Sequence, residues 1–135
     1  MKLALLAAAA LAAAVLVPLA AAAMKPHPAP VRVIMDPKLG HVLATKTRHA
    51  LYTWRKEKAG TIRCTGACAK AWPPLLVSGP VAKHVKGVMG TFGTIRRPDG
   101  KTQLTWNRHA LYRYQGDPKG VAKCNGVDRW FAVKG

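Results

Sequence analysis

The sequence predicts a mostly β fold in which two duplicated β-meander repeats pack as one small sandwich or barrel, with one short helix near Cys68. The first observation is a duplication, because residues 48–52 read RHALY and residues 108–112 read RHALY again. A fixed internal period of this kind is the signature of a repeat protein. The second observation is the alternation of polar and apolar side chains over residues 101–106, which is typical of a half-buried strand.

The duplication extends beyond the pentapeptide in a single register without a gap. Neither repeat alone has enough apolar residues for an ample core, so we expect the two repeats to form one cooperative domain. Duplicated meanders that share a core are expected to be related by a pseudo-two-fold axis. The aligned pairs outside the pentapeptide are Gly40 and Gly100, Thr45 and Thr105, Trp54 and Tyr114, Glu57 and Asp117, Gly60 and Gly120, and Cys64 and Cys124.

Three segments are expected along the chain. Residues 1–23 have a positive start, an Ala/Leu-rich run and three small residues at the end, which predicts a signal peptide, with an uncleaved membrane anchor as the alternative. Residues 24–30 have proline at every second position from Pro26, which predicts an extended, mobile linker. Residues 31–135 are expected to form the single β domain, with repeats at about 31–77 and 91–133.

Within the first repeat, β-branched and apolar residues are separated by turn residues. Asp36 and Pro37 open a turn that Gly40 closes. Pro73 and Pro74 must end the helix expected over residues 67–72. The strands expected here are residues 31–35, 41–45, 50–54 and 75–77.

The second repeat is expected to have the same order of strands but no helix. Its first turn, at residues 97–100, has Pro and Gly at the positions that a tight turn favours. A loop is expected at residues 116–120, between the third and the last strand. The strands expected here are residues 91–96, 101–106, 110–114 and 130–133.

The charge of the chain is strongly positive, with 22 Lys and Arg against 5 Asp and Glu, a formal net charge of +17. Such a charge attracts polyanions over long distances. Because the predicted export argues against nucleic acid, we expect an anionic envelope polymer or a membrane surface as the partner, and a periplasmic or secreted location. The alternative is an ordinary solvated surface, because the basic residues are scattered along the chain.

The repeated stretches match a Tyr-x-(Phe/Trp/Tyr)-x-x-Asp motif and are accompanied by CTGACAKAWPP at residues 64–74 and RPDG at residues 97–100. Together these features resemble a bacterial family of secreted-repeat predicted lipoproteins that is named for the motif. The resemblance implies an exported, repeat-built domain of unknown biochemical function. The chain departs from the family at Glu57, which replaces Asp, in lacking a lipid-attachment cysteine, and in having Cys124. The motif residues are Tyr52, Trp54 and Glu57 in the first repeat and Tyr112, Tyr114 and Asp117 in the second.

The motif has a structural and a functional interpretation. Tyr112 and Tyr114 lie on one face of a strand, since side chains alternate between faces. They either pack in the core, with Asp117 ordering its turn, or form a small ligand-binding lip. The sequence contains no GxSxG or HExxH motif, and one acid per repeat does not favour hydrolysis. We therefore expect no enzymatic activity and no cofactor.

The three cysteines allow several arrangements. A disulfide between Cys64 and Cys68 is the first expectation for an exported protein, and a Cys64–Cys124 bridge between the repeats is the second. A third arrangement is a copper or zinc site, or a redox-linked role, based on Cys64 and Cys68. His49 and His109, which are otherwise expected as exposed turn residues, are weak candidates for further metal ligands. Trp72, Trp106 and Trp130 are expected in the core, with sugar stacking as the alternative for Trp72.

Overall fold

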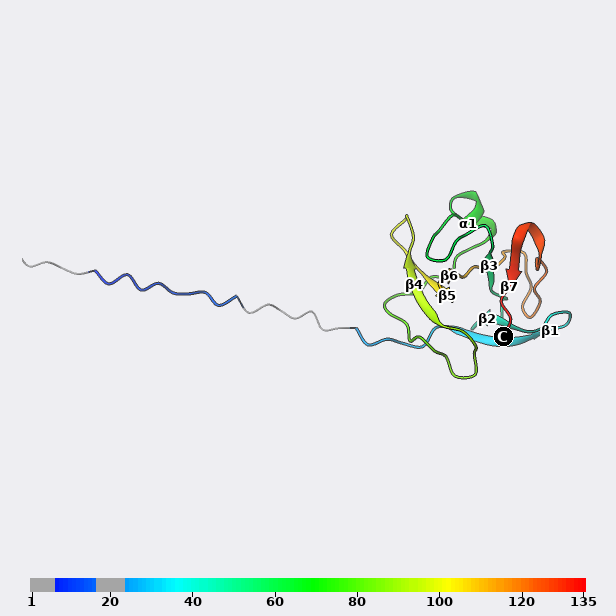
Figure 1. The fold of residues 1–135 in the computed structure, drawn as a ribbon, viewed down its shortest axis with the longest axis horizontal. Helices are drawn as coiled ribbons and strands as arrows, with labels where there is room; N and C mark the ends of the chain where they lie inside the picture. The colour runs from blue at the N-terminus through cyan, green and yellow to red at the C-terminus, as the bar shows by residue number, and fades with distance from the viewer. Residues whose placement is uncertain (1–6, 17–23) are drawn as a thin grey trace, which may run out of the picture.

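The computed structural model describes residues 7–16 and 24–135 of the chain. Residues 7–16 are exposed and carry no helix or strand, and Figure 1 shows them well away from the folded domain. The predicted signal peptide therefore falls partly outside the described residues. Within the described part of the chain, no helix has the length and apolar character that a membrane span requires.

The fold is mostly β, as predicted, and the described residues form three small sheets and one short α-helix. The first sheet pairs β1 with β2, the second pairs β3 with β7, and the third has the order β4-β5-β6. Across residues 24–135 the sheets pack in a sandwich-like arrangement without closing into a barrel. The elements are β1 (Val31–Asp36), β2 (Gly40–Thr45), β3 (Tyr52–Trp54), α1 (Ala67–Ala71), β4 (Phe92–Arg96), β5 (Thr102–Trp106), β6 (His109–Ala110), the 3-10 helix η1 (Val127–Arg129) and β7 (Trp130–Ala132).

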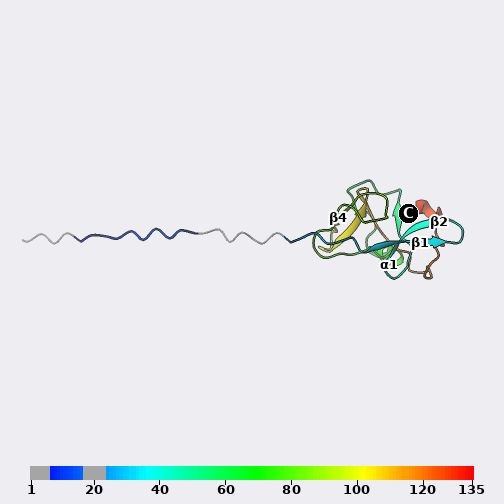
Figure 2. The ribbon, with the colours of Figure 1, turned by 90° about the horizontal axis from the view of Figure 1, so that it is seen from below.

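Each repeat begins with an antiparallel hairpin whose turn is closed by a glycine with positive φ. In the β1–β2 hairpin Asp36 pairs with Gly40, and the Asp36 carboxylate accepts hydrogen bonds from the N–H groups of Lys38 and Leu39. Gly40 has φ 76° and Gly100, its equivalent in the β4–β5 turn, has φ 83°, a region that glycine enters without a steric penalty. The two hairpins lie at opposite ends of the domain when it is seen from below (Figure 2).

The two repeats exchange their last strands. In the first repeat, Leu75 inserts into the sheet of the second, where its N–H donates to Leu111 O (3.0 Å) and its carbonyl accepts from Leu104 N (2.8 Å). The segment around Val133, in the second repeat, inserts into the sheet of the first repeat. Its N–H donates to Leu51 O (2.9 Å), and its carbonyl accepts from Leu43 N (2.8 Å). Each sheet is therefore completed by a strand of the other repeat.

Some predicted strands are shorter than expected or consist of isolated bridges. Residues 75–77 do not form a regular strand but pair at Pro74 with Tyr112 and at Leu76 with Gln103, because Pro73 and Pro74 have no N–H for a continuous ladder. The strand predicted at residues 50–54 begins at Tyr52, and the one predicted at 110–114 is reduced to β6 and a bridge at Tyr112. The lengths of these predicted strands were overestimated because the exchanged segments around Leu75 and Val133 interrupt each meander.

The core has an aromatic part and an aliphatic part. Tyr52, Trp72, Tyr112 and Trp130 are buried in the aromatic part, at the junction of the repeats. Burial of each such side chain contributes roughly 1.5–3 kcal/mol to stability. The aliphatic part draws on both hairpins and both exchanged segments, and its buried members are Ala29, Val31, Leu43, Leu51, Phe92, Leu104, Leu111 and Val133.

The segment predicted as a mobile linker is attached to the domain from His27 onward. His27 pairs with Val81 in a parallel bridge, its N–H donates to Pro80 O (3.2 Å), and its carbonyl accepts from Ala82 N (2.8 Å). Ala29 is fully buried. The extended conformation agrees with the prediction, but the expectation of mobility is corrected for residues 27–30, because backbone hydrogen bonds and a buried alanine fix them.

The His27 side chain strengthens this attachment. Its Nε2 lies 2.8 Å from Ser78 O and its Nδ1 lies 3.0 Å from Pro28 O. Only a protonated imidazole can donate to both carbonyls. The hydrogen bonds to Ser78 and Pro28 accordingly raise the pKa of His27.

We expect the attachment of residues 27–30 to weaken as the pH rises. Because the folded-state pKa is raised, the stabilisation is fully present below the unfolded value near 6.5 and is lost as the pH rises through the folded value. Amide-exchange protection at Ala82 should therefore be higher at about pH 5.5 than at about pH 8.5. The difference should disappear in His27→Ala and persist in the control His84→Ala. Equal protection of the wild type at both pH values would contradict the double hydrogen bond.

Candidate functional site

The two copies of the repeated motif meet at the centre of the domain. Tyr52 and Tyr112, which occupy equivalent positions, form an antiparallel bridge with each other. The N–H of Tyr52 donates to Tyr112 O at 2.8 Å, and the N–H of Tyr112 donates to Tyr52 O at 3.0 Å. A reciprocal pair between equivalent residues places the predicted pseudo-two-fold axis between these two tyrosines.

The tyrosine side chains cross to the acid of the opposite repeat. The hydroxyl of Tyr52 donates to Asp117 Oδ2 at 2.5 Å, and the hydroxyl of Tyr112 donates to Glu57 Oε2 at 2.6 Å. All four residues are buried. Burial, and then the hydrogen bond to a carboxylate, raises the pKa of each tyrosine far above its usual value. Each motif is therefore complete only in the presence of the other repeat.

The buried carboxylates also hold the loops that precede Cys64 and Cys124. Glu57 Oε2 accepts from the N–H groups of Arg63 (2.7 Å) and Cys64 (3.0 Å). In the second repeat, Asp117 Oδ1 accepts from Lys123 N (3.0 Å), while the Tyr52 hydroxyl accepts from Cys124 N (3.3 Å).

The two acids differ in one respect. Both oxygens of Asp117 are engaged, one by Tyr52 and one by Lys123. Three donors converge on Oε2 of Glu57, whereas Oε1 accepts no hydrogen bond from the described residues. The longer side chain at position 57 thus leaves one carboxylate oxygen free.

Four aromatic residues form a stack through the core: Trp54, Trp130, Trp72 and Tyr114. Trp54 stacks on Trp130 (ring centroids 5.0 Å apart, 5° between planes), and Trp130 stacks on Trp72 (3.9 Å, 6°). Tyr114 continues the stack from Trp72 at 4.8 Å. Such offset aromatic pairs contribute about 0.5–1.5 kcal/mol beyond the area they bury. Because Trp72 is buried within this stack, it offers no surface on which a sugar could stack.

The motif therefore lies within the core of the protein. Its tyrosines and acids are partnered by one another and by backbone N–H groups, and Trp54 and Tyr114 are only half-buried at the two ends of the stack. Tyr112 contributes to packing and not to a ligand-binding lip. The motif fixes the loops that precede Cys64 and Cys124 and joins the two repeats.

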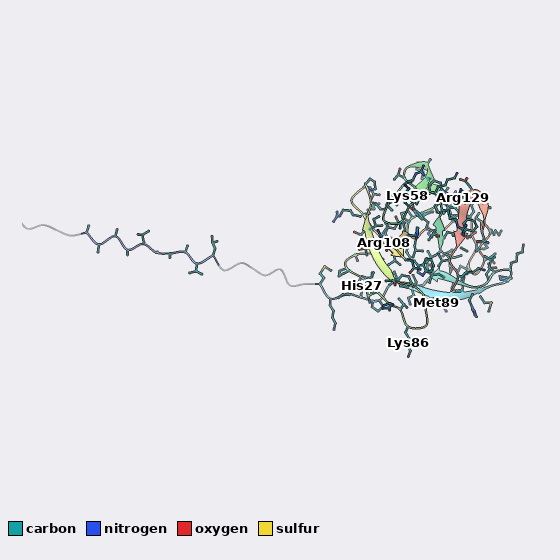
Figure 3. The ribbon with its side chains drawn as sticks, in the orientation of Figure 1. His27, Lys58, Lys86, Met89, Arg108 and Arg129 are labelled. Carbon is teal, nitrogen blue, oxygen red and sulfur yellow. A yellow bond between two sulfur atoms is a disulfide. The ribbon has the colours of Figure 1, made fainter. Side chains whose placement is uncertain are left out.

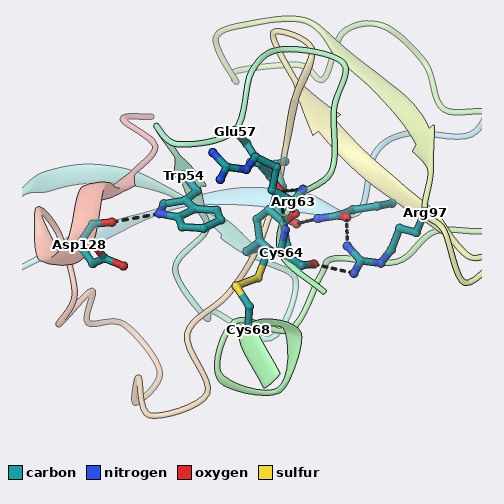
Figure 4. The surroundings of a disulfide bond; sticks show 10 residues. Trp54, Glu57, Arg63, Cys64, Cys68, Arg97 and Asp128 are labelled. Carbon is teal, nitrogen blue, oxygen red and sulfur yellow. Dashed lines mark hydrogen bonds between the residues drawn. A yellow bond between two sulfur atoms is a disulfide. The ribbon is translucent and has the colours of Figure 1, made fainter. Parts of the chain in front are cut away.

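The cysteines are arranged asymmetrically. Cys64 and Cys68 form a disulfide beside α1, and Figure 4 shows it next to Glu57 and Arg97. The carbonyl of Cys64 accepts from Arg97 Nη2 at 2.8 Å. Cys124 carries a free thiol, and the position equivalent to Cys68 is Asp128. Burial, followed by the charge of Asp117, raises the pKa of the Cys124 thiol.

The weak metal candidates do not form a cluster. Within residues 7–16 and 24–135, no three His, Cys, Asp or Glu side chains are grouped so that they could hold a metal ion. The sulfurs of Cys64 and Cys68 are bonded to each other, and His49 Nδ1 lies 3.1 Å from Thr47 Oγ1. His49 and His109 line two separate grooves.

The larger of these two grooves has a volume of about 470 Å³ and lies beside β3 and β7. We call it the β3–β7 groove. It combines three aromatic residues, several cations and the otherwise buried Glu57. The residues that line it are Thr53, Trp54, Arg55, Glu57, Trp106, His109, Arg129, Phe131, Ala132, Val133 and Lys134.

The distribution of charge differs sharply between interior and surface. Asp36, Glu57 and Asp117 are buried. Burial alone raises the pKa of Asp36, but the N–H groups of Ala122, Leu39 and Lys38 lower it more, so the net shift is downward. The two exposed acids are paired, Asp128 with Lys56 at 2.7 Å and Asp99 with Arg97 at 3.8 Å.

The basic residues are almost all on the surface. Of the 21 Lys and Arg side chains in residues 24–135, Arg97 is buried and Arg113 is half-buried, whereas the others are exposed. In Figure 3, Lys58 and Arg129 are labelled near the top of the domain, Arg108 towards the left and Lys86 at the bottom. The surface is therefore positive with very few compensating negative charges.

Sequence reasoning identified the motif but missed the groove. Arg55 and Arg129 were not singled out, because they are far apart in sequence and only the β3–β7 pairing brings them together. One signal was present, the Glu at position 57 where the motif has Asp.

An interlocked pair of β repeats with a closed, hydrogen-bonded core and a basic surface defines a tandem-repeat β module. The model of one family, described as a secreted repeat of unknown function, matches residues 33–76 and again residues 93–134. The chain belongs to this family, which confirms the resemblance and supports export. No curated protein and no solved structure matches the chain.

We expect removal of either crossed hydroxyl to destabilise the domain. Tyr52→Phe leaves Asp117 without its phenol donor and Cys124 N without an acceptor, and Tyr112→Phe removes a donor from Glu57. Each should lower the free energy of unfolding by about 1.5–3 kcal/mol, as measured by equilibrium urea unfolding.

The matched control is Tyr114→Phe, which removes the hydroxyl of a half-buried tyrosine that bonds to no carboxylate. It should change the free energy of unfolding by about 0.5 kcal/mol or less. If Tyr52→Phe were as mild as this control, the crossed bonds would not be what joins the repeats.

Proposed function

We propose that the protein is an exported, strongly basic binding module of the cell envelope, periplasmic or secreted, that associates with an anionic polymer and performs no catalysis. The observation that carries this proposal is the segregation of charge. All five acids are either buried or paired with a cation, while nearly all basic side chains face solvent. Exposed cations of one sign attract polyanions and increase the rate at which they are captured.

A rigid module supports binding better than a flexible basic tail would. The interlocked repeats fix the backbone positions that carry the cations, so little backbone entropy is lost when a polymer binds. The proposal includes no catalytic role for the acids of the motif, Glu57 and Asp117, because both contribute to holding the core together. Their carboxylates accept hydrogen bonds from tyrosines and backbone N–H groups.

The scattered distribution of the exposed apolar residues favours a polymer over a membrane surface as the partner. Stable attachment to a bilayer needs a contiguous apolar face or a lipid anchor in addition to charge. The large exposed hydrophobic side chains of the domain come from separate segments, with Met35 in β1, Leu76 after α1, Met89 in a loop and Val127 in η1. Anionic vesicles are therefore a control in the test below.

Soft-metal binding or redox chemistry through Cys64 and Cys68 is not the function that we propose. A metal-coordinating cysteine is a thiolate. In this structure both sulfurs are held in the disulfide, so a metal site would first require its reduction.

We expect the mature protein to be retained on an immobilised anionic polysaccharide and to be released by salt. Screening shortens the range of charge–charge attraction from about 30 Å at 0.01 M salt to about 3 Å at 1 M, so the affinity should fall steadily as salt is added. A neutral polysaccharide of the same length should not retain the protein. Retention that does not decrease as salt is added, or that is equal on the neutral polysaccharide, would contradict the proposal. Binding to anionic vesicles but to neither polymer would point to a membrane instead.

A further inference from the structure

We infer that the β3–β7 groove is a specific binding site for one sugar unit that carries a carboxylate or phosphate group. This inference rests on the proposed function and narrows it from a basic surface to one site. Two arginines, one acid and the aromatic residues Trp106 and Phe131 are among the residues that line this groove, and each residue type meets a different requirement of such a ligand.

The arginines provide a clamp for the anionic group. Arg55 N donates to Arg129 O at 3.0 Å, so the two residues are neighbours across the end of the β3–β7 sheet, and both line the groove. The guanidinium carbon of Arg55 lies 4.1 Å from the centroid of the Phe131 ring, which holds that side chain in place.

The donors of this clamp are not neutralised within the protein. The ion pairs of the described residues are Lys56–Asp128 and Arg97–Asp99, so neither Arg55 nor Arg129 is paired with an acid. Guanidinium groups bind carboxylates and phosphates through two parallel N–H bonds. The pair therefore offers the donors that such an anion requires.

The backbone before β7 is strained where it presents Arg129. Asp128 has φ 45° and Arg129 has φ 66°, two consecutive non-glycine residues in the left-handed region. The structure imposes this conformation, since Trp54 Nε1 donates to Asp128 O at 3.0 Å and Gly126 N donates to Trp130 O at 2.7 Å. These hydrogen bonds fix the backbone that carries Arg129.

Glu57 is the acceptor that the proposal assigns to a sugar hydroxyl. The residue is 4% exposed and is among those that line the groove; its Oε2 is bonded to the core, and its Oε1 accepts no hydrogen bond from the described residues. Phe131, which shares a face with Arg55, and the half-buried Trp106 are the aromatic residues that the proposal assigns to packing against a sugar ring. An inorganic anion would use the arginines but not these groups.

The equivalent groove of the other half lacks this combination. It contains Lys46, His49 and Arg113, but no aromatic residue and no acid. The positions that correspond to Trp106 and Thr53 are Lys46 and Arg113. The departure from symmetry predicts one specific site per chain and not two.

The test uses the mature protein and four short probes: trigalacturonic acid, glucose 1-phosphate, neutral maltotriose and inorganic tripolyphosphate. Titration calorimetry and tryptophan fluorescence measure binding. We expect one site per chain for the anionic sugars. Arg55→Gln together with Arg129→Gln should weaken their binding by at least about tenfold, because charge-assisted hydrogen bonds are lost.

The matched control is Lys83→Gln with Lys86→Gln, which removes the same charge from exposed residues outside the groove, with Lys86 remote from Arg129 in Figure 3. It should weaken binding by less than about twofold, as expected for distant, screened charges. Arg55→Lys retains the charge but not the planar fork, and should give an intermediate loss. Circular dichroism and urea unfolding establish that each variant is folded.

The outcomes separate the site from the proposed function. If both double variants lose affinity equally, the assignment of the groove is wrong while general polyanion binding stands. If tripolyphosphate binds as tightly as the anionic sugars with the same dependence on Arg55 and Arg129, sugar recognition is overturned. If the wild type binds the long anionic polymer but none of the short probes, the specific site is overturned. Failure to bind the polymer as well would overturn both proposals.

Discussion

The crossed hydrogen bonds between Tyr52 and Asp117 and between Tyr112 and Glu57 are the interaction on which the rest of the structure depends. Each joins a tyrosine of one repeat to the acid of the other, so a single repeat would leave a buried carboxylate without its donor. Removing one donor from a buried charge is costly even though backbone N–H groups of the same repeat remain, so the crossed bonds favour pairing of the repeats. The exchange of the strands around Leu75 and Val133 extends the same dependence to the backbone.

The crossed hydrogen bonds also affect the charge of the surface. The crossed bonds and the hairpin turn keep Glu57, Asp117 and Asp36 in the interior, and these are three of only five acids in the chain. The surface that remains is almost entirely cationic, so the internal architecture and the attraction to polyanions have one origin. The substitution of Glu for Asp at position 57 breaks the equivalence of the repeats, and it leaves one oxygen free on a residue that lines the same groove as Arg55 and Arg129. The duplicated repeats form the scaffold, and the difference between the repeats at position 57 distinguishes the β3–β7 groove from its equivalent.

The sequence predicted the fold class well because repeats, turns and alternation are local signals. The RHALY duplication, the turns closed by Gly40 and Gly100 and the short helix before Pro73 each depend on neighbours in the chain. The exchange of strands could not be predicted, because equal hydrophobic patterns in both repeats fit either partner. The groove could not be predicted either, since Arg55 and Arg129 become neighbours only through that exchange. The attachment of residues 27–30 was missed because a proline-rich segment predicts extended backbone but not what it packs against.

The most direct test of this account is to prepare residues 24–78 and 79–135 as separate chains and to record their NMR spectra alone and mixed. Because each half lacks the acid and the last strand that complete its own sheet, neither half alone should give the dispersed spectrum of a folded protein. The equimolar mixture should give dispersed signals and a single cooperative unfolding transition. A half that folds cooperatively by itself would contradict the central claim that the two repeats form one interlocked unit.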